Sequence, residues 1–123
     1  MIPYLKAQIA EAFTPETQRA IVSEYLQMRI LHSLQSVGAM IPLAFHGGTA
    51  LRILYQLPRY SEDLDFALER QSEQYDFRKY LTTIQRDMTA ETYVIGVFAY
   101  YAPKSFTICC ALSNNLRLLS YLL

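Results

Sequence analysis

One stretch of the chain, residues 45–66, constrains the fold more than any other. Its pattern predicts a strand, a Gly-Gly turn, a short helix, a Pro break and a second strand. In the second strand, Asp63 and Asp65 alternate with Leu64 and Phe66. Successive strand side chains point to opposite faces, so the apolar pair can enter a core. The two carboxylates then stay together at a surface, about 7 Å apart along the backbone.

The paired carboxylates predict a metal site. Two like charges this close repel each other unless a proton or a cation lies between them. Mg²⁺ takes one or two carboxylates together with substrate phosphates, and Mn²⁺ has similar preferences. Upstream, Gly47 and Gly48 open the short helix, where backbone N–H groups favour phosphate, and the Thr49 hydroxyl either binds phosphate or caps the helix. Such an arrangement is typical of phosphoryl or nucleotidyl transfer.

Polar residues just before the second strand have two interpretations each. Arg59 either contacts a triphosphate bidentately or pairs with Glu62 at the surface. Ser61 shares the face of Asp63 by alternation, so its phosphorylation would add negative charge beside the carboxylates; otherwise it bonds its own backbone. Alternation places Glu62 outside the site, and Arg52 is expected to be a solvated residue.

The motif resembles a known family. The segments Gly-Gly-Thr-Ala-Leu-Arg and Pro-Arg-Tyr-Ser-Glu-Asp-Leu-Asp-Phe resemble the AbiEii/AbiGii toxins, which belong to the polymerase-beta-like nucleotidyltransferase superfamily, and residues 24–27 resemble the leading helix of that family. The resemblance implies Mg²⁺-dependent transfer of a nucleotide from an NTP to an acceptor such as tRNA, opposed by a cognate antitoxin. It also implies that Asp63 and Asp65 are catalytic and bind the metal, and that the nucleotide is bound by Gly47, Gly48, Thr49, Arg59 and Ser61.

The chain departs from the family pattern in its second half. The superfamily has a third carboxylate on a later strand, and here Glu91 is the candidate worth testing. AbiEii-like proteins are longer, with a downstream Lys motif and a C-terminal helical region, so this chain is expected to be a truncated member. Two alternatives therefore remain: a catalytically incomplete fragment that acts only by binding, and a minimal nucleotidyltransferase antitoxin.

Composition bounds the remaining possibilities. A chain of 123 residues that is 52% hydrophobic and 18% charged is expected to form one domain with a core. With 11 basic and 11 acidic residues, it has no overall basic field for nucleic acid, although a local patch remains possible. The adjacent Cys109 and Cys110 are expected to be small buried hydrophobes. No signal peptide or membrane span is expected, so the protein should be cytoplasmic.

These patterns together predict an α+β fold with a polymerase-beta-like nucleotidyltransferase core, in which a small mixed sheet packs against helices and the C-terminal helical region is missing. Within a single domain, 1–123, we expect N-terminal helices over 1–37, a core over 41–111 and an irregular or helical tail over 112–123. The expected helices cover residues 1–13, 15–36, 49–56 and 76–88, and the expected strands include 41–45, 91–101 and 106–111. In the third helix, Leu51, Leu54 and Tyr55 are expected to face inward.

Overall fold

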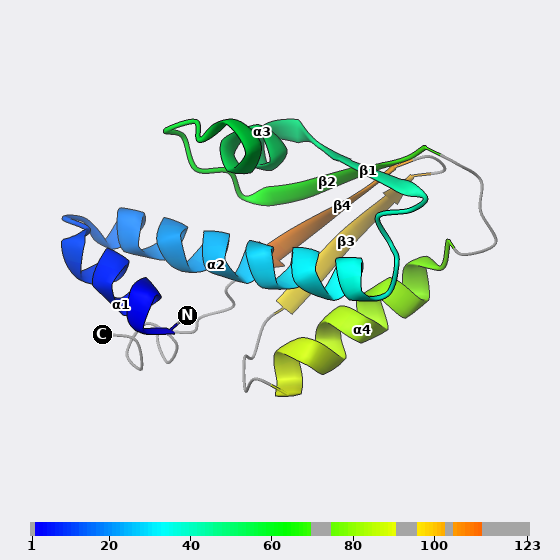
Figure 1. Ribbon diagram of the computed structural model, residues 1–123, viewed down its shortest axis with the longest axis horizontal. Helices are drawn as coiled ribbons and strands as arrows, with labels where there is room; N and C mark the ends of the chain where they lie inside the picture. The colour runs from blue at the N-terminus through cyan, green and yellow to red at the C-terminus, as the bar shows by residue number, and fades with distance from the viewer. Residues whose placement is uncertain (1, 70–74, 91–95, 103–104, 112–123) are drawn as a thin grey trace.

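Helices and an antiparallel sheet make up the protein in a computed structural model that describes residues 2–69, 75–90, 96–102 and 105–111 (Figure 1). The predicted tail over 112–123, the candidate carboxylate Glu91 and the side chains of Cys109 and Cys110 lie outside this description. The fold is α+β, as predicted. In chain order, its elements are α1 (Ile2–Glu11), α2 (Pro15–Ser36), β1 (Leu43–His46), α3 (Gly47–Tyr55), β2 (Asp63–Leu68), α4 (Phe77–Ala90), β3 (Gly96–Ala102) and β4 (Ser105–Ala111).

The bounds of α2 confirm the helix predicted over residues 15–36. At its start, the Thr14 hydroxyl accepts a hydrogen bond from the backbone N–H of Thr17 at 3.1 Å, and Pro15 occupies the first turn. The helix ends at Ser36 with Val37 as its C-cap, and Gly38 follows with φ +73°, a left-handed conformation that favours glycine. Local start and stop chemistry therefore sets both ends of α2.

The sheet has the strand order β1-β2-β4-β3, and each described pairing is antiparallel. This corrects the mixed sheet expected from the sequence. The reason lies in α3, which is only nine residues long. His46 at the end of β1 pairs with Asp65 near the start of β2, so the chain turns back at one end of the sheet. A parallel pair would need a connection that returns along the whole strand.

The core lies on one face of β2 and β4. Leu64 and Phe66 are fully buried, as predicted, and they point the same way as Phe106 and Ile108. The ring centroids of Phe66 and Phe106, which are cross-strand neighbours, lie 4.9 Å apart. Helices α2 and α4 cover this face with apolar side chains, and Figure 1 shows α2 crossing in front of the sheet. The other face of β2 is left for its polar residues.

A second, smaller hydrophobic cluster joins α1 to the first half of α2. Its buried members are Leu5, Ile9, Val22 and Leu26. The main cluster instead draws on the second half of α2, the strands and α4. Helix α2 therefore connects two separate cores. Within the described residues, no helix is both long and apolar enough to cross a bilayer.

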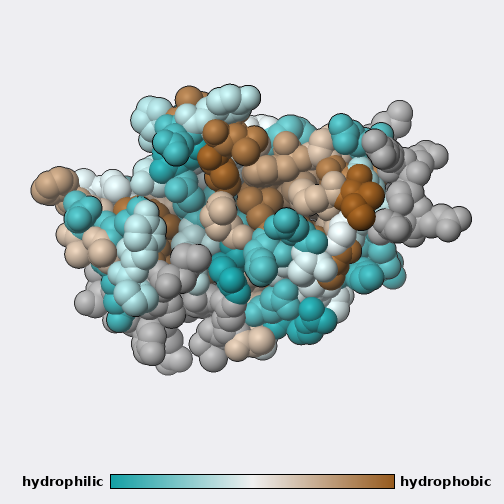
Figure 2. Space-filling view, viewed as in Figure 1, coloured by the Kyte–Doolittle hydropathy of each residue, from teal (hydrophilic) through white to brown (hydrophobic). Residues whose placement is uncertain are grey.

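Helix α3 faces the opposite way from the prediction. Leu51, Leu54 and Tyr55 are exposed, and Thr49 and Ala50 are its buried residues. Small side chains on the inner face let α3 approach β2 closely. The exposed residues have the helical spacing of a core-facing stripe, so periodicity alone predicted the wrong face. Figure 2 shows hydrophobic side chains gathered on the surface over α3 and β1.

Candidate active site

The two carboxylates of β2 lie on the face of the sheet opposite the core. Asp63 and Asp65 are half-buried and alternate with the fully buried Leu64 and Phe66. The neighbouring strand supports the second carboxylate, since Thr107 is paired with Asp65 and donates its hydroxyl to Asp65 Oδ1 at 2.8 Å. The structure thus brings the two predicted carboxylates to a common surface and orients one of them through β4.

Gly47 places the start of α3 directly against the Asp65 carboxylate. Its φ is +85°, a conformation that side-chain-bearing residues rarely adopt. A Cβ built on Gly47 would lie 3.2 Å from Asp65 Cγ and would collide with Oδ2. Glycine is therefore required here by both conformation and space.

Gly48 lies at the rim of an adjacent cleft of about 640 Å³, which Ser61 and Asp63 also line. A Cβ on Gly48 would come within 3.1 Å of Ser61 Oγ. The full lining consists of Gly48, Leu57, Arg59, Tyr60, Ser61, Glu62 and Asp63. The cleft therefore joins four of the predicted site residues, whereas Asp65 and Gly47 lie beside it.

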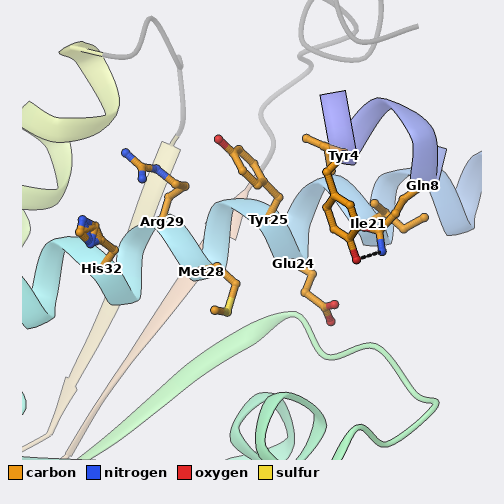
Figure 3. Close-up of a pocket in the computed structure, with 9 residues that line it drawn as sticks. Tyr4, Gln8, Ile21, Glu24, Tyr25, Met28, Arg29 and His32 are labelled. Carbon is orange, nitrogen blue, oxygen red and sulfur yellow. Dashed lines mark hydrogen bonds between the residues drawn. The ribbon is translucent and has the colours of Figure 1, made fainter. Parts of the chain in front are cut away.

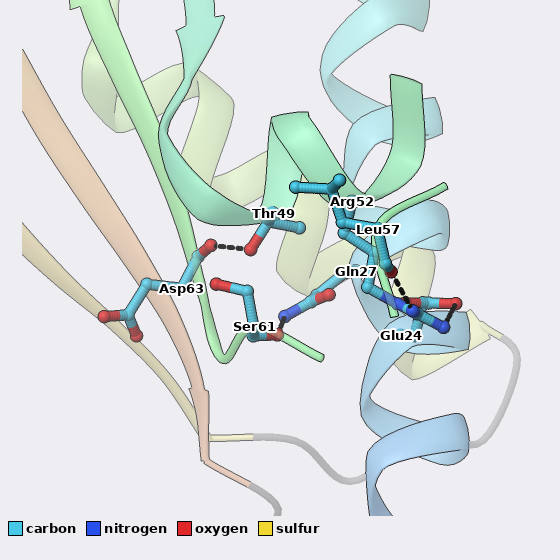
Figure 4. Close-up of polar contacts among 7 residues, drawn as sticks. All are labelled: Glu24, Gln27, Thr49, Arg52, Leu57, Ser61 and Asp63. Carbon is cyan, nitrogen blue, oxygen red and sulfur yellow. Dashed lines mark hydrogen bonds and ion pairs between the residues drawn. The ribbon is translucent and has the colours of Figure 1, made fainter. Parts of the chain in front are cut away.

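The Thr49 hydroxyl bonds to the carboxylate strand, a role that neither of its two interpretations, phosphate binding or helix capping, predicted. Only 1% of its surface is exposed, and its hydroxyl donates to the backbone carbonyl of Asp63 (Figure 4). This hydroxyl points into the protein because α3 packs its small residues against β2. The bond ties the start of α3 to the start of the carboxylate strand.

Glu62 lines the cleft, which corrects the prediction that it lies outside the site. The prediction extended the alternation of strand side chains back to Glu62, whereas β2 begins only at Asp63. Arg59 is exposed and lines the same cleft, and no ion pair joins it to Glu62 within the described part of the chain. Its guanidinium therefore remains open to a ligand.

Arg52 is a bonded residue and not the solvated one that was predicted. It forms an ion pair with Glu24 of α2, donates to the carbonyl of Leu57 and lies over the ring of Tyr60, with Cζ 3.7 Å from the ring centroid. The hydrogen bond to Glu24 raises the pKa of Arg52 above its ordinary value, against the opposing effect of burial. A single Arg on a short helix gave no sequence signal of these partners.

Gln27 of α2 is a further residue that sequence reasoning missed. Its side chain is 1% exposed, and its amide donates to the carbonyl of Ser61 at 2.8 Å (Figure 4). The available signal was a polar residue next to the apolar stripe of a helix, since such a buried amide requires a partner.

The carboxylates present suit a hard divalent cation that also binds a phosphate ligand. Among the described residues, no three His, Cys, Asp or Glu side chains group closely enough to hold a metal alone. Asp63 and Asp65 supply oxygen ligands of the type Mg²⁺ takes, and Mg²⁺ commonly completes its shell with substrate phosphates and water. The open backbone of the Gly turn lies beside them, where phosphate would be accommodated.

A second hollow, of about 540 Å³, lies between α1 and α2 (Figure 3). Tyr4 and Gln8 of α1 line it and are joined by a 3.0 Å hydrogen bond. Tyr25 and Met28 of α2 contribute to its mainly apolar wall. Neither carboxylate of β2 reaches it, so it is separate from the candidate active site.

Comparison with known proteins gives one match. The family model described as "Nucleotidyl transferase AbiEii toxin, Type IV TA system" matches residues 29–103, which is more than half of the chain. The matched region contains the Gly turn, the cleft and both carboxylates. Searches of the curated proteins and of the solved structures give no significant match.

Proposed function

The chain belongs to the AbiEii family of nucleotidyltransferase toxins of type IV toxin–antitoxin systems, and we propose that it transfers a nucleotide from an NTP to an acceptor hydroxyl with Mg²⁺ or Mn²⁺. The observation that carries this proposal is the contact between Gly47 and the Asp65 carboxylate. It brings the start of α3, where we propose that phosphate binds, beside the face of β2 where we propose that the metal binds. Both parts that nucleotidyl transfer requires are therefore adjacent.

The protein residues bind and orient the triphosphate. Backbone N–H groups at Gly47 and Gly48 bind phosphate oxygens, aided by the positive end of the α3 dipole. Arg59 contributes a fixed positive charge and up to two parallel hydrogen bonds from the rim of the cleft. Asp63 and Asp65 would hold the cation, and Thr107 keeps the Asp65 carboxylate in its orientation. When bound, Mg²⁺ neutralises triphosphate charge and stabilises the departing pyrophosphate.

The acceptor that we propose is RNA, with tRNA as the first to test, and a cognate antitoxin opposes the activity. Support for the toxin assignment comes from the family match. Neutral overall charge means that an RNA would be held by a local surface near the cleft. NTP and tRNA are both cytoplasmic, so we propose the cytoplasm as the place of action.

The test combines ligand-dependent stability with transfer activity. We expect the melting temperature of the wild type to rise with added Mn²⁺ and NTP, by an amount that corresponds to about 2.7 kcal/mol at 100 times the dissociation constant. Asp63→Asn combined with Asp65→Asn should remove this rise and the transfer of labelled nucleotide to tRNA. A wild type that shows neither a rise nor transfer would refute the proposal.

A second candidate function is binding without transfer. It is favoured by the absence of a third carboxylate from the metal-binding face among the described residues. In that case the wild type would show the ligand-dependent rise in melting temperature while no labelled nucleotide reached any acceptor. The two measurements therefore separate the two candidates.

A further inference from the structure

Helix α2 holds the segment that carries the cleft, residues 57–61, at both of its ends (Figure 4). At the first end, Glu24 pairs with Arg52, which in turn donates to the carbonyl of Leu57. At the other end, Gln27 donates to the carbonyl of Ser61 at 2.8 Å. Glu24 and Gln27 are three residues apart on α2, so they lie on the same helix face.

The contacts reach the cleft through the backbone. Leu57, Tyr60 and Ser61 each line the cleft and each contacts Arg52 or Gln27. Arg59, between them, is exposed, and among the described residues its side chain makes no hydrogen bond or ion pair with Arg52 or Gln27. The backbone on either side of Arg59 is therefore fixed while its own side chain remains available.

The hydrogen bonding of Gln27 is incomplete, which favours a positioning role over a stabilising one. Its Oε1 is buried and has no hydrogen-bond partner among the described residues. A buried amide that satisfies only one of its two polar ends costs desolvation, and an apolar side chain of similar size would avoid that cost. What the amide provides and an apolar side chain cannot is a fixed distance to the Ser61 carbonyl.

We propose that Glu24 and Gln27 of α2 and Arg52 of α3, here together named the α2 brace, are positioning residues. They fix where Arg59 and Asp63 lie relative to Gly48. Each acts through backbone groups of the cleft and does not touch the nucleotide. The inference rests on the proposed nucleotidyl transfer, because its benefit is the correct placement of the triphosphate between Gly48 and Arg59. Loss of a brace residue should therefore weaken nucleotide binding in a protein that is still folded.

The chain offers a matched control for Gln27. Gln18 lies on the same helix and also donates its amide to a backbone carbonyl, that of Ile9 at 3.5 Å, but it supports α1. Gln27→Leu and Gln18→Leu therefore remove the same amide from two side chain–backbone hydrogen bonds of α2, of which the Gln18 bond is the longer and the less buried. Only the first bond leads to the cleft.

The experiment measures binding of Mn²⁺ with each of the four NTPs by calorimetry, together with KM and kcat for transfer to tRNA. We expect Gln27→Leu to weaken NTP binding about tenfold or more, with a matching rise in KM, and Gln18→Leu to leave both within about twofold. Glu24→Gln, which keeps the side-chain length but removes the charge that holds Arg52, should also weaken NTP binding. It serves as the second variant if Gln27→Leu does not fold.

Two results would overturn the inference while leaving the proposed function standing. One is unchanged NTP affinity in both brace variants. The other is an equal loss of affinity in Gln27→Leu and Gln18→Leu, which would point to general destabilisation. A wild type that binds no NTP would instead reject the proposed function, and the positioning role with it.

Discussion

Gly47 and Gly48 are neighbours in the sequence but face different constraints. Gly47 has a positive φ and lies against Asp65, whereas a Cβ on Gly48 would only press on the flexible hydroxyl of Ser61. At the scale of single residues, both the backbone conformation and the lack of room for a Cβ require glycine at position 47. The second mainly keeps the rim of the cleft clear for a ligand.

Gly47→Ala should therefore destabilise the protein much more than Gly48→Ala. A left-handed conformation costs a non-glycine residue about 1–2 kcal/mol, and the collision with Asp65 adds to it. For Gly48→Ala we expect a change in the free energy of unfolding within about 0.5 kcal/mol. Urea unfolding of both variants measures the difference. Equal losses would contradict the conformation assigned to Gly47.

At the scale of elements, the contact between α2 and α4 includes Asp87, a carboxylate whose ionisation makes the contact depend on pH. A hydrogen bond from Ser33 is the largest cause that lowers the pKa of Asp87 below its ordinary value, and Arg86 adds to the effect. The Arg86–Asp87 ion pair measures 3.1 Å. Ser33 is buried on α2, so this carboxylate links the two helices that cover the sheet.

The lowered pKa makes the α2–α4 contact sensitive to acid. The hydrogen bond between Ser33 and Asp87 stabilises the fold fully when the pH is above the unfolded pKa of Asp, about 3.9. This stabilisation is lost as the pH falls through the lower pKa of the folded state. NMR titration should find the pKa of Asp87 below 3.9, and Ser33→Ala should move it back toward that value. Ser33→Ala should also reduce how steeply stability falls as the pH drops below the unfolded pKa of about 3.9. An unchanged Asp87 titration in this variant would exclude the Ser33 bond as the cause.

Elements with local signals were predictable, and long-range contacts were not. The start and end of α2, the alternation in β2 and the glycines before α3 each follow from neighbouring residues. Glu24, the ion-pair partner of Arg52, lies 28 residues away, and Ser61, the partner of Gln27, lies 34 residues away, at positions that no periodicity connects. The direction of α3 was missed because its large apolar residues, which have helical spacing, are exposed, whereas the small Thr49 and Ala50 are buried. Antiparallel pairing of β1 with β2 depends on the direction in which the chain leaves α3. The hydrophobic pattern of the sequence does not determine that direction.

At the scale of the whole molecule, two separate clusters predict two levels of local stability. Ile9 belongs to the cluster between α1 and α2, and Ile84 belongs to the main cluster under the sheet. Ile9→Ala should speed hydrogen exchange of α1 amides and leave β2 amides protected, because α1 can open alone. Ile84→Ala should speed exchange in β2, since removing a buried Ile side chain costs about 2–5 kcal/mol of the stability that all core strands share. Uniform acceleration in both variants would show that the two clusters unfold together.

The strand order also has a consequence for the newly synthesised chain. Because β4 lies between β2 and β3, β3 leaves the ribosome before the strand that joins it to the sheet. Thr107, which orients the Asp65 carboxylate, arrives with that same late strand. Synthesis runs from the N-terminus, so the helices and the segments of β1 and β2 are made before β4. The hydrogen bond that orients the Asp65 carboxylate can therefore form only after β4 has been translated.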